Sequence, residues 1–112
     1  MLDILYWDDY FIAIHKPVGL LVHRSEIDRH ETHFALQLLR DQIGQRVYPV
    51  HRLDKPTSGT LLFALDQESA KLLTRLFTEQ QVTKTYLAIV RGFADPAGTI
   101  DYPLKEQLDK IA

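Results

Sequence analysis

Residues 51–65 read HRLDKPTSGTLLFAL. The second half of this stretch, Thr60–Leu65, is almost entirely apolar, which is typical of a strand that is covered on both faces. The first half places the carboxylate of Asp54 just ahead of Pro56 and Gly59, two residue types that favour a stiff turn. The stretch therefore predicts a buried strand with an ionisable acid displayed on the turn that leads into it.

Further strands and two helices are predicted on both sides of this stretch. Alternating or apolar runs predict strands at residues 2–6, 10–15, 20–23, 47–50, 84–91 and 99–102. Apolar residues at helical spacing predict one helix from Thr32 to Ile43, ended by Gly44, and a second helix capped by Asp66. The second helix has one apolar stripe, formed by Ala70, Leu73 and Phe77. The expected fold class is α+β, with a mixed or antiparallel sheet and two helices.

The composition excludes several classes of protein. A chain of 112 residues fits one compact domain or part of a larger one. It has no apolar run long enough to cross a membrane, and its acidic start lacks the basic flank of a secretory signal. The absence of cysteine excludes disulfides and thiolate sites, so we expect a reducing, cytoplasmic location. The five histidines show no recognised ligand spacing, so no metal site is expected.

Charge is distributed unevenly along the chain. Residues 40–91 carry eight basic and five acidic side chains, a net charge of +3, whereas the whole chain carries −2. This basic excess surrounds residues 51–59. It is compatible with a local phosphate-binding face, and also with chance, because the counts are small.

Asp54 has two interpretations from the residues alone. It is either a structural acid that caps the turn or pairs with Arg52 or Lys55, or a carboxylate kept ionised by positive charge and able to act as nucleophile or base. Protein kinases share a His-Arg-Asp fragment, but Leu53 intervenes here and no Gly-rich nucleotide loop precedes it. Aspartic proteases need two carboxylates that share a proton, and the chain has one such motif.

Three motifs carry a resemblance to a known family. His51-Arg52-Leu53-Asp54, followed by Thr57-Ser58-Gly59, resembles the catalytic signature of the pseudouridine synthases that modify ribosomal and transfer RNA. Lys16-Pro17, Gly19 and Val22-His23 resemble the N-terminal motif of that family, and residues 84–92, with Tyr86, resemble the motif that holds its active-site tyrosine. The similarity covers essentially the whole chain. It is greatest to the branch that modifies uridine 65 of certain transfer RNAs.

The resemblance implies an isomerase that needs no cofactor and acts on tRNA. Asp54 is then the catalytic residue, either attacking C1′ of the ribose to form an ester or removing the C2′ proton to form a glycal. The implied substrate-binding residues are Arg52, Tyr86 and Lys84. Arg52 either enters the base stack or forms a salt bridge, and Tyr86 packs either on the flipped uracil or within a sheet. Lys84 either contacts phosphate or is a solvated surface lysine. The implied supports of the loop are His51, Thr57, Ser58 and Gly59.

The resemblance also implies that residues 1–112 are the N-terminal portion of a single catalytic domain. The remaining portion holds further strands and an arginine expected to pair with Asp54. A full-length enzyme is expected to be a monomer. The 112-residue piece alone is expected either to be inactive and only marginally stable, or to self-associate. The alternatives are a non-catalytic RNA-binding module, an inactive fragment of the same scaffold, and a structural domain.

Overall fold

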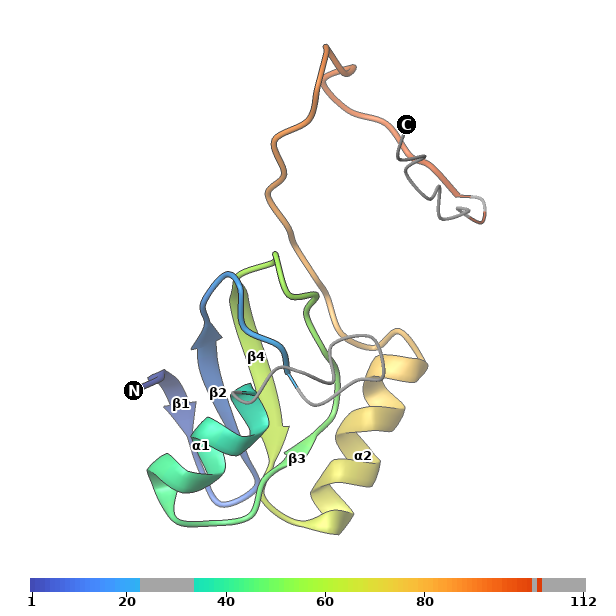
Figure 1. Ribbon diagram of the computed structural model, residues 1–112. Helices are drawn as coiled ribbons and strands as arrows, with labels where there is room; N and C mark the ends of the chain where they lie inside the picture. The colour runs from blue at the N-terminus through green and yellow to red at the C-terminus, as the bar shows by residue number, and fades with distance from the viewer. Residues whose placement is uncertain (23–33, 102, 104–112) are drawn as a thin grey trace.

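The computed structural model describes residues 1–22, 34–101 and 103 (Figure 1). These residues form four strands and two helices: β1 (Asp3–Trp7), β2 (Phe11–Lys16), α1 (Ala35–Ile43), β3 (Tyr48–Pro49), β4 (Gly59–Ala64) and α2 (Gln67–Thr78). The strands make one sheet in the order β1-β2-β4-β3, and every neighbouring pair is antiparallel. The predicted α+β class, with an antiparallel sheet and two helices, is confirmed for the described residues.

Strands β2 and β4 form the centre of the sheet. They pair along their whole length, from Phe11 opposite Ala64 to Lys16 opposite Gly59. Because side chains alternate between faces along a strand, Ile12, Ile14 and Lys16 lie on the same face. The register therefore brings the end of β2 next to the start of β4, which directly follows the loop of residues 51–58.

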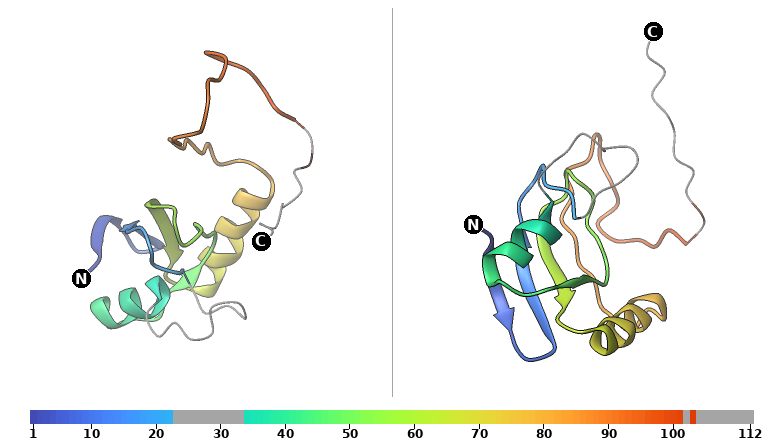
Figure 2. Two further views of the ribbon diagram at one scale, coloured as in Figure 1. Left: turned by 45° about the horizontal axis from the view of Figure 1, so that its top comes forward. Right: turned by 60° about the horizontal axis from the view of Figure 1, so that its bottom comes forward.

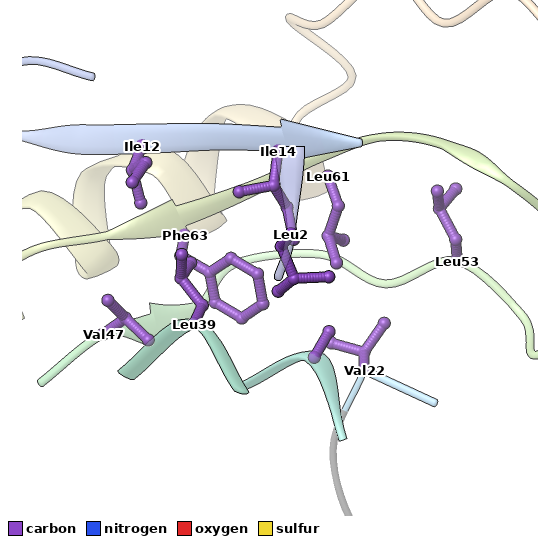
Figure 3. Close-up of a cluster of buried hydrophobic side chains, with 10 residues drawn as sticks. Leu2, Ile12, Ile14, Val22, Leu39, Val47, Leu53, Leu61 and Phe63 are labelled. Atoms are coloured by element: carbon purple, nitrogen blue, oxygen red, sulfur yellow. The ribbon is translucent and has the colours of Figure 1, made fainter. Parts of the chain in front are cut away.

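The hydrophobic core lies between this face of the sheet and α1 (Figures 1 and 3). Helix α1 contributes the buried residues Ala35 and Leu39, four positions apart and so on one face. Burying one leucine or isoleucine side chain contributes about 1.5–3 kcal/mol relative to leaving it exposed. The buried cluster consists of Leu2, Ile12, Ile14, Val22, Ala35, Leu39, Val47, Leu53, Leu61 and Phe63.

Helix α1 begins without a side-chain cap. The N–H groups of Ala35 and Leu36 donate instead to the backbone carbonyls of Leu21 and Val22, at 2.7 and 2.9 Å. The predicted stop at Gly44 is confirmed: Gly44 has φ 65° and its N–H donates to the carbonyl of Arg40. The predicted start at Thr32 lies outside the described residues.

A glutamine side chain ties α1 to the edge of the sheet. Oε1 of Gln42 accepts from the N–H of Leu2 at 2.8 Å, and Nε2 of Gln42 donates to the carbonyl of Leu2 at 2.9 Å. The amide thus satisfies both backbone groups of Leu2, as a neighbouring strand would. The residue pattern gave no sign of this contact.

Helix α2 lies beside β3 and β4, at the other end of the sheet from β1 (Figures 1 and 2). Its predicted cap is confirmed, because the carboxylate of Asp66 accepts from the N–H of Ser69 at 2.7 Å. Its predicted apolar stripe is only half-buried. No helix among the described residues is long and apolar enough to cross a membrane.

Three predicted strands differ from the structure. Residues 84–91 form no strand, and their side chains are exposed. The described residues 99–101 also form no strand, and Tyr102 lies outside the described residues. Alternating side chains favour a strand only where a neighbouring strand supplies hydrogen bonds, and no described strand lies along these segments. At 20–23 the described part shows an isolated bridge between Leu21 and Phe34, and His23 is not described.

Candidate active site

The loop that joins β3 to β4 has alternating buried and exposed side chains. Val50 and Leu53 are each 7% exposed, and Leu53 packs in the core cluster (Figure 3). Arg52 and Asp54, on either side of Leu53, are exposed. Leucine burial therefore anchors the middle of the loop and holds the carboxylate of Asp54 at the surface, as the sequence predicts.

A hydrogen-bonded turn fixes the backbone directly after Asp54. The N–H of Thr57 donates to the carbonyl of Asp54 at 2.9 Å, closing a four-residue turn that contains Pro56. Gly59 then has φ 143°, a conformation that side-chain-bearing residues rarely adopt. The predicted stiff turn is thus present, and a glycine is required where it joins β4.

Lys16 lies beneath this turn and is completely buried. Its Nζ donates to the carbonyl of Pro17 at 3.0 Å and to the carbonyl of Lys55 at 3.2 Å. The Lys55 carbonyl also accepts from the N–H of Gly19 at 2.7 Å. Burial lowers the pKa of Lys16, and the negative charge of Asp54 acts in the opposite direction. The ammonium group of Lys16 is thus hydrogen-bonded to the backbone of the turn that begins at Asp54.

His51 links the same loop to β4 and α2. Its ring stacks on Phe77 with centroids 4.3 Å apart, and its Nε2 accepts from the N–H of Leu62 at 3.0 Å. Backbone pairing between β3 and β4 ends where Pro49 lies opposite Phe63. The His51 side chain then accepts from the N–H of Leu62, the neighbouring residue of β4. The acceptor at Nε2 requires the neutral ring with its proton on Nδ1. His51 thus contacts both β4 and α2, and its role as a support of the loop stays a prediction.

An open hollow of about 770 Å³ lies between this loop and the segment that follows α2. One wall of the hollow is lined by His51, Leu53 and residues 56–60, and another wall by residues 82–87. Lys84 and Tyr86 therefore come close to the loop that joins β3 to β4. Tyr86 is 58% exposed. Arg52 and Asp54 are exposed and do not line the hollow.

The remaining candidates have simpler surroundings. Within residues 1–22, 34–101 and 103, the hydroxyls of Thr57 and Ser58 make no hydrogen bond and Asp54 forms no ion pair with Arg52. Their support and binding roles stay predictions. The described part also contains no group of three potential metal ligands.

Sequence reasoning missed the role of Lys16 at this site. A signal was present: Lys16 continues the two-residue period of Ile12 and Ile14, the buried positions of β2. A lysine in phase with buried positions indicates an ammonium group inside the core. Such groups are rare unless polar partners surround them.

The stability of the chain is expected to fall as the pH drops below about 6.5 because of His51. Burial, and then the charge of Lys84, lowers the pKa of His51 from 6.5. The unfolded chain therefore takes up a proton at a higher pH than the folded chain does. Full stability is present above pH 6.5 and is lost as the pH falls toward the lowered pKa. Urea unfolding midpoints at several pH values measure this dependence.

Two variants separate this effect from other titrations. His51→Phe keeps an aromatic ring on Phe77 but removes the titrating acceptor, so its unfolding midpoint should depend less on pH over the same range. His15→Gln, which replaces an exposed histidine of β2, should keep the wild-type dependence. A His51→Phe variant with the wild-type pH dependence would disprove the assignment.

Comparison with known proteins gives one consistent family. The sequence profile described as RNA pseudouridylate synthase matches residues 10–111. The chain is 67% identical to tRNA pseudouridine synthase C of Pasteurella multocida and 57% identical to that of Vibrio cholerae. These alignments cover 99% and 100% of this chain but 46% of each relative. The chain therefore spans about half the length of the curated relatives it matches.

Solved structures agree with the sequence comparison. Human RNA Pseudouridylate Synthase Domain Containing 4 superposes with a TM-score of 0.55 at 30% identity, over 70% of this chain and 30% of that one. Human RNA Pseudouridylate Synthase Domain Containing 1 gives a TM-score of 0.56 at 26% identity, over 71% and 29%.

Proposed function

Because the chain belongs to the RNA pseudouridylate synthase family, we propose that it supplies the catalytic aspartate of an enzyme that converts a uridine of tRNA to pseudouridine. One observation carries this proposal most directly. Asp54 is exposed on a turn whose backbone is fixed on both sides, by the core packing of Leu53 and by the Thr57–Asp54 hydrogen bond. A carboxylate held in this way suits chemistry on a bound nucleoside.

The reaction breaks the N1–C1′ bond of uridine and joins C5 of the same base to C1′. It gains and loses no atom overall and changes no oxidation state, so it requires no cofactor. Asp54 either attacks C1′, forming an ester that C5 later displaces, or removes the C2′ proton, forming a glycal to which C5 adds. One carboxylate suffices because the uracil leaves as an anion and stays bound.

The positions of three residues support the substrate-binding roles proposed for them. Arg52 is exposed on the same loop as Asp54, where a long cation can take the place of an extruded base. Tyr86 and Lys84 lie across the hollow from that loop and offer a stacking face and a phosphate contact. Stacking a base on an aromatic ring contributes about 1–3 kcal/mol, comparable to the few kcal/mol that unstacking costs.

The substrate assignment rests on the relatives, which are named for activity on tRNA. We propose uridine 65 of tRNA as the position and the cytoplasm as the location. We also propose that residues 1–112 are the N-terminal portion of one catalytic domain, which is monomeric at full length. The exposed Leu87, Ile89 and Phe93 then need covering by the rest of that domain, and the isolated chain self-associates through them.

A chimera tests the function, because a relative supplies the part of the catalytic domain that follows residue 112. Residues 1–112 replace the matching part of the Pasteurella multocida relative, and the product is incubated with tRNA carrying C5-tritiated uridine. Formation of pseudouridine replaces the hydrogen at C5, so release of tritium measures turnover. We expect release from the chimera, and no release at position 65 when that uridine is changed to cytidine.

The same assay separates the alternatives. A chimera that binds tRNA in a salt-dependent manner but releases no tritium would identify a binding module and overturn the enzymatic proposal. Release from the chimera at another uridine would overturn position 65 alone. Release by the isolated 112-residue chain would overturn the proposed domain boundary.

A further inference from the structure

We propose that the end of the sheet at which β1 turns into β2 is a docking surface for a partner protein, where Trp7 and Asp9 receive the guanidinium group of an arginine of that partner. This inference goes beyond the proposed function and does not depend on it. Strand β4 runs from Gly59, beside the loop of Asp54, to Ala64, at the proposed surface (Figure 1). Six strand residues, about 17–20 Å, therefore separate this surface from the candidate active site.

A hollow of about 400 Å³ marks the surface. Three connections meet around it: the turn between β1 and β2, the segment between α1 and β3, and the residue after β4. An indole, two carboxylates, an amide and a leucine side chain thus border one concave space, which combines an aromatic face with negative charge. The lining residues are Trp7, Asp8, Asp9, Gln45 and Leu65.

Trp7 is the one tryptophan of the chain and is 49% exposed. It lies directly opposite Ile12 of β2, which is completely buried, so the two side chains share the core-facing side of the sheet. Tryptophan side chains are on average well buried, yet the described residues leave about half of this one uncovered. Exposed large aromatic side chains are typical of contact surfaces between proteins.

Hydrogen bonds fix the turn that carries the two carboxylates. Oδ1 of Asp8 accepts from the N–H groups of Phe11 and Tyr10, at 2.9 and 2.7 Å. These two bonds lower the pKa of Asp8, so its carboxylate is ionised at neutral pH. The N–H of Leu65 donates to the carbonyl of Tyr10 at 2.9 Å and joins the turn to the chain after β4. A surface that is already held in one shape loses less entropy on binding.

Charge determines the kind of partner. Residues 1–14 contain Asp3, Asp8 and Asp9 but no lysine, arginine or histidine, so this surface repels the phosphates of RNA and attracts cations. Among the described residues, Asp9 forms no ion pair. Arg46, which adjoins the hollow along the chain, has its guanidinium group over the ring of Tyr48, 5.3 Å from the centroid. The complementary partner therefore presents a cation.

An arginine fits this hollow better than a lysine does. Its guanidinium group is planar, stacks on an aromatic face and can donate two hydrogen bonds to one carboxylate, whereas an ammonium group is a compact, strongly hydrated charge. Tryptophan is the aromatic residue that attracts cations most strongly. Trp7 and Asp9 supply both parts of such a contact from one fixed turn.

A peptide titration of the chimera tests the surface. The probe is a capped peptide of alternating glycine and arginine, and matched peptides carry lysine or citrulline, the neutral analogue of arginine, in its place. The indole N–H signal of Trp7 in proton–nitrogen correlation spectra, identified by its loss in Trp7→Phe, reports binding. We expect a saturable shift with the arginine peptide, an affinity at least about threefold lower with lysine, and no shift with citrulline.

Two variants locate the charge that matters. Asp9→Asn should lower the affinity for the arginine peptide by about two- to fivefold. Asp95→Asn removes an exposed carboxylate from the segment after α2 and should leave the affinity unchanged. Both positions are exposed, so neither substitution disturbs the packing of the fold.

The contrary outcomes identify other occupants. An indole N–H of Trp7 that is protected from exchange with water in the chimera alone would mean that the rest of the domain covers the hollow. A Trp7 signal that shifts with protein concentration alone would indicate a second copy, and one that shifts with an oligouridine would indicate RNA. Each of these results would overturn the proposal, as would an absent shift with the arginine peptide, an equal shift with citrulline, or an unchanged affinity in Asp9→Asn.

Discussion

Asp54→Asn is expected to lower tritium release from C5-labelled tRNA by at least about a thousandfold in the chimera. The amide is nearly the same size as the carboxylate but is neither a nucleophile nor a base, so both the ester and the glycal route stop. Because Asp54 is exposed, the substitution leaves no buried cavity or unpaired group in the fold. Single-turnover measurements with excess enzyme give the rate of the chemical step.

The affinity for tRNA should change little in the same variant, or increase slightly, because a negative charge facing phosphates has been removed. Asp41→Asn is the matched control: Asp41 is an exposed carboxylate of α1 that pairs with Arg40 at 3.0 Å. That control should keep the wild-type rate. Release by Asp54→Asn at the wild-type rate would show that another group performs the chemistry.

Leu61→Ala is expected to destabilise the fold by about 2–5 kcal/mol. Leu61 is 0% exposed in β4, opposite Ile14 of β2, and packs in the core cluster (Figure 3). Its truncation leaves a cavity in the cluster that also includes Leu53, the residue that anchors the loop of Asp54. For a domain of this size, each kcal/mol lowers Tm by about 4–8 °C. Thermal unfolding followed by circular dichroism measures the change.

Leu72→Ala makes the same chemical change at a site that is 57% exposed on α2. It should alter stability by no more than about 0.5 kcal/mol. Equal losses in the two variants would mean that Leu61 is not part of a packed core. The pair thus tests the core with the chemistry of the substitution held constant.

Local sequence signals predicted the elements that depend on local physics. The strands at β2 and β4, the glycine stop of α1 and the aspartate cap of α2 all follow from residue periodicity or from one terminal residue. The turn after Asp54 belongs to the same class. These features need no knowledge of distant residues, and the structure has them within one or two positions.

Features that depend on distant partners could not be predicted in this way. The alternation in residues 84–91 predicted a strand, but a strand requires a neighbour, and the described residues provide none there. The start of α1 uses carbonyls of Leu21 and Val22 in place of the side-chain cap that local rules lead one to look for. The Gln42–Leu2 contact joins residues 40 positions apart and leaves no trace in either local pattern.

The candidate site shows the same division. The sequence singled out Asp54 and its loop, and the structure exposes that side chain on a fixed turn. The approach of Lys84 and Tyr86 to the loop was an implication of family resemblance, because spacing alone cannot bring residues about 30 positions apart together. Lys16 stayed hidden because its charge suggested a surface residue, while its register placed it in the core.

The attachment of the Asp54 turn through the carbonyl of Lys55 has a consequence for sequence variation at that position. Main-chain oxygens are common to all twenty amino acids, so a substitution at position 55 keeps the oxygen that accepts from Lys16 and Gly19. The attachment of this turn therefore does not depend on the residue type at position 55.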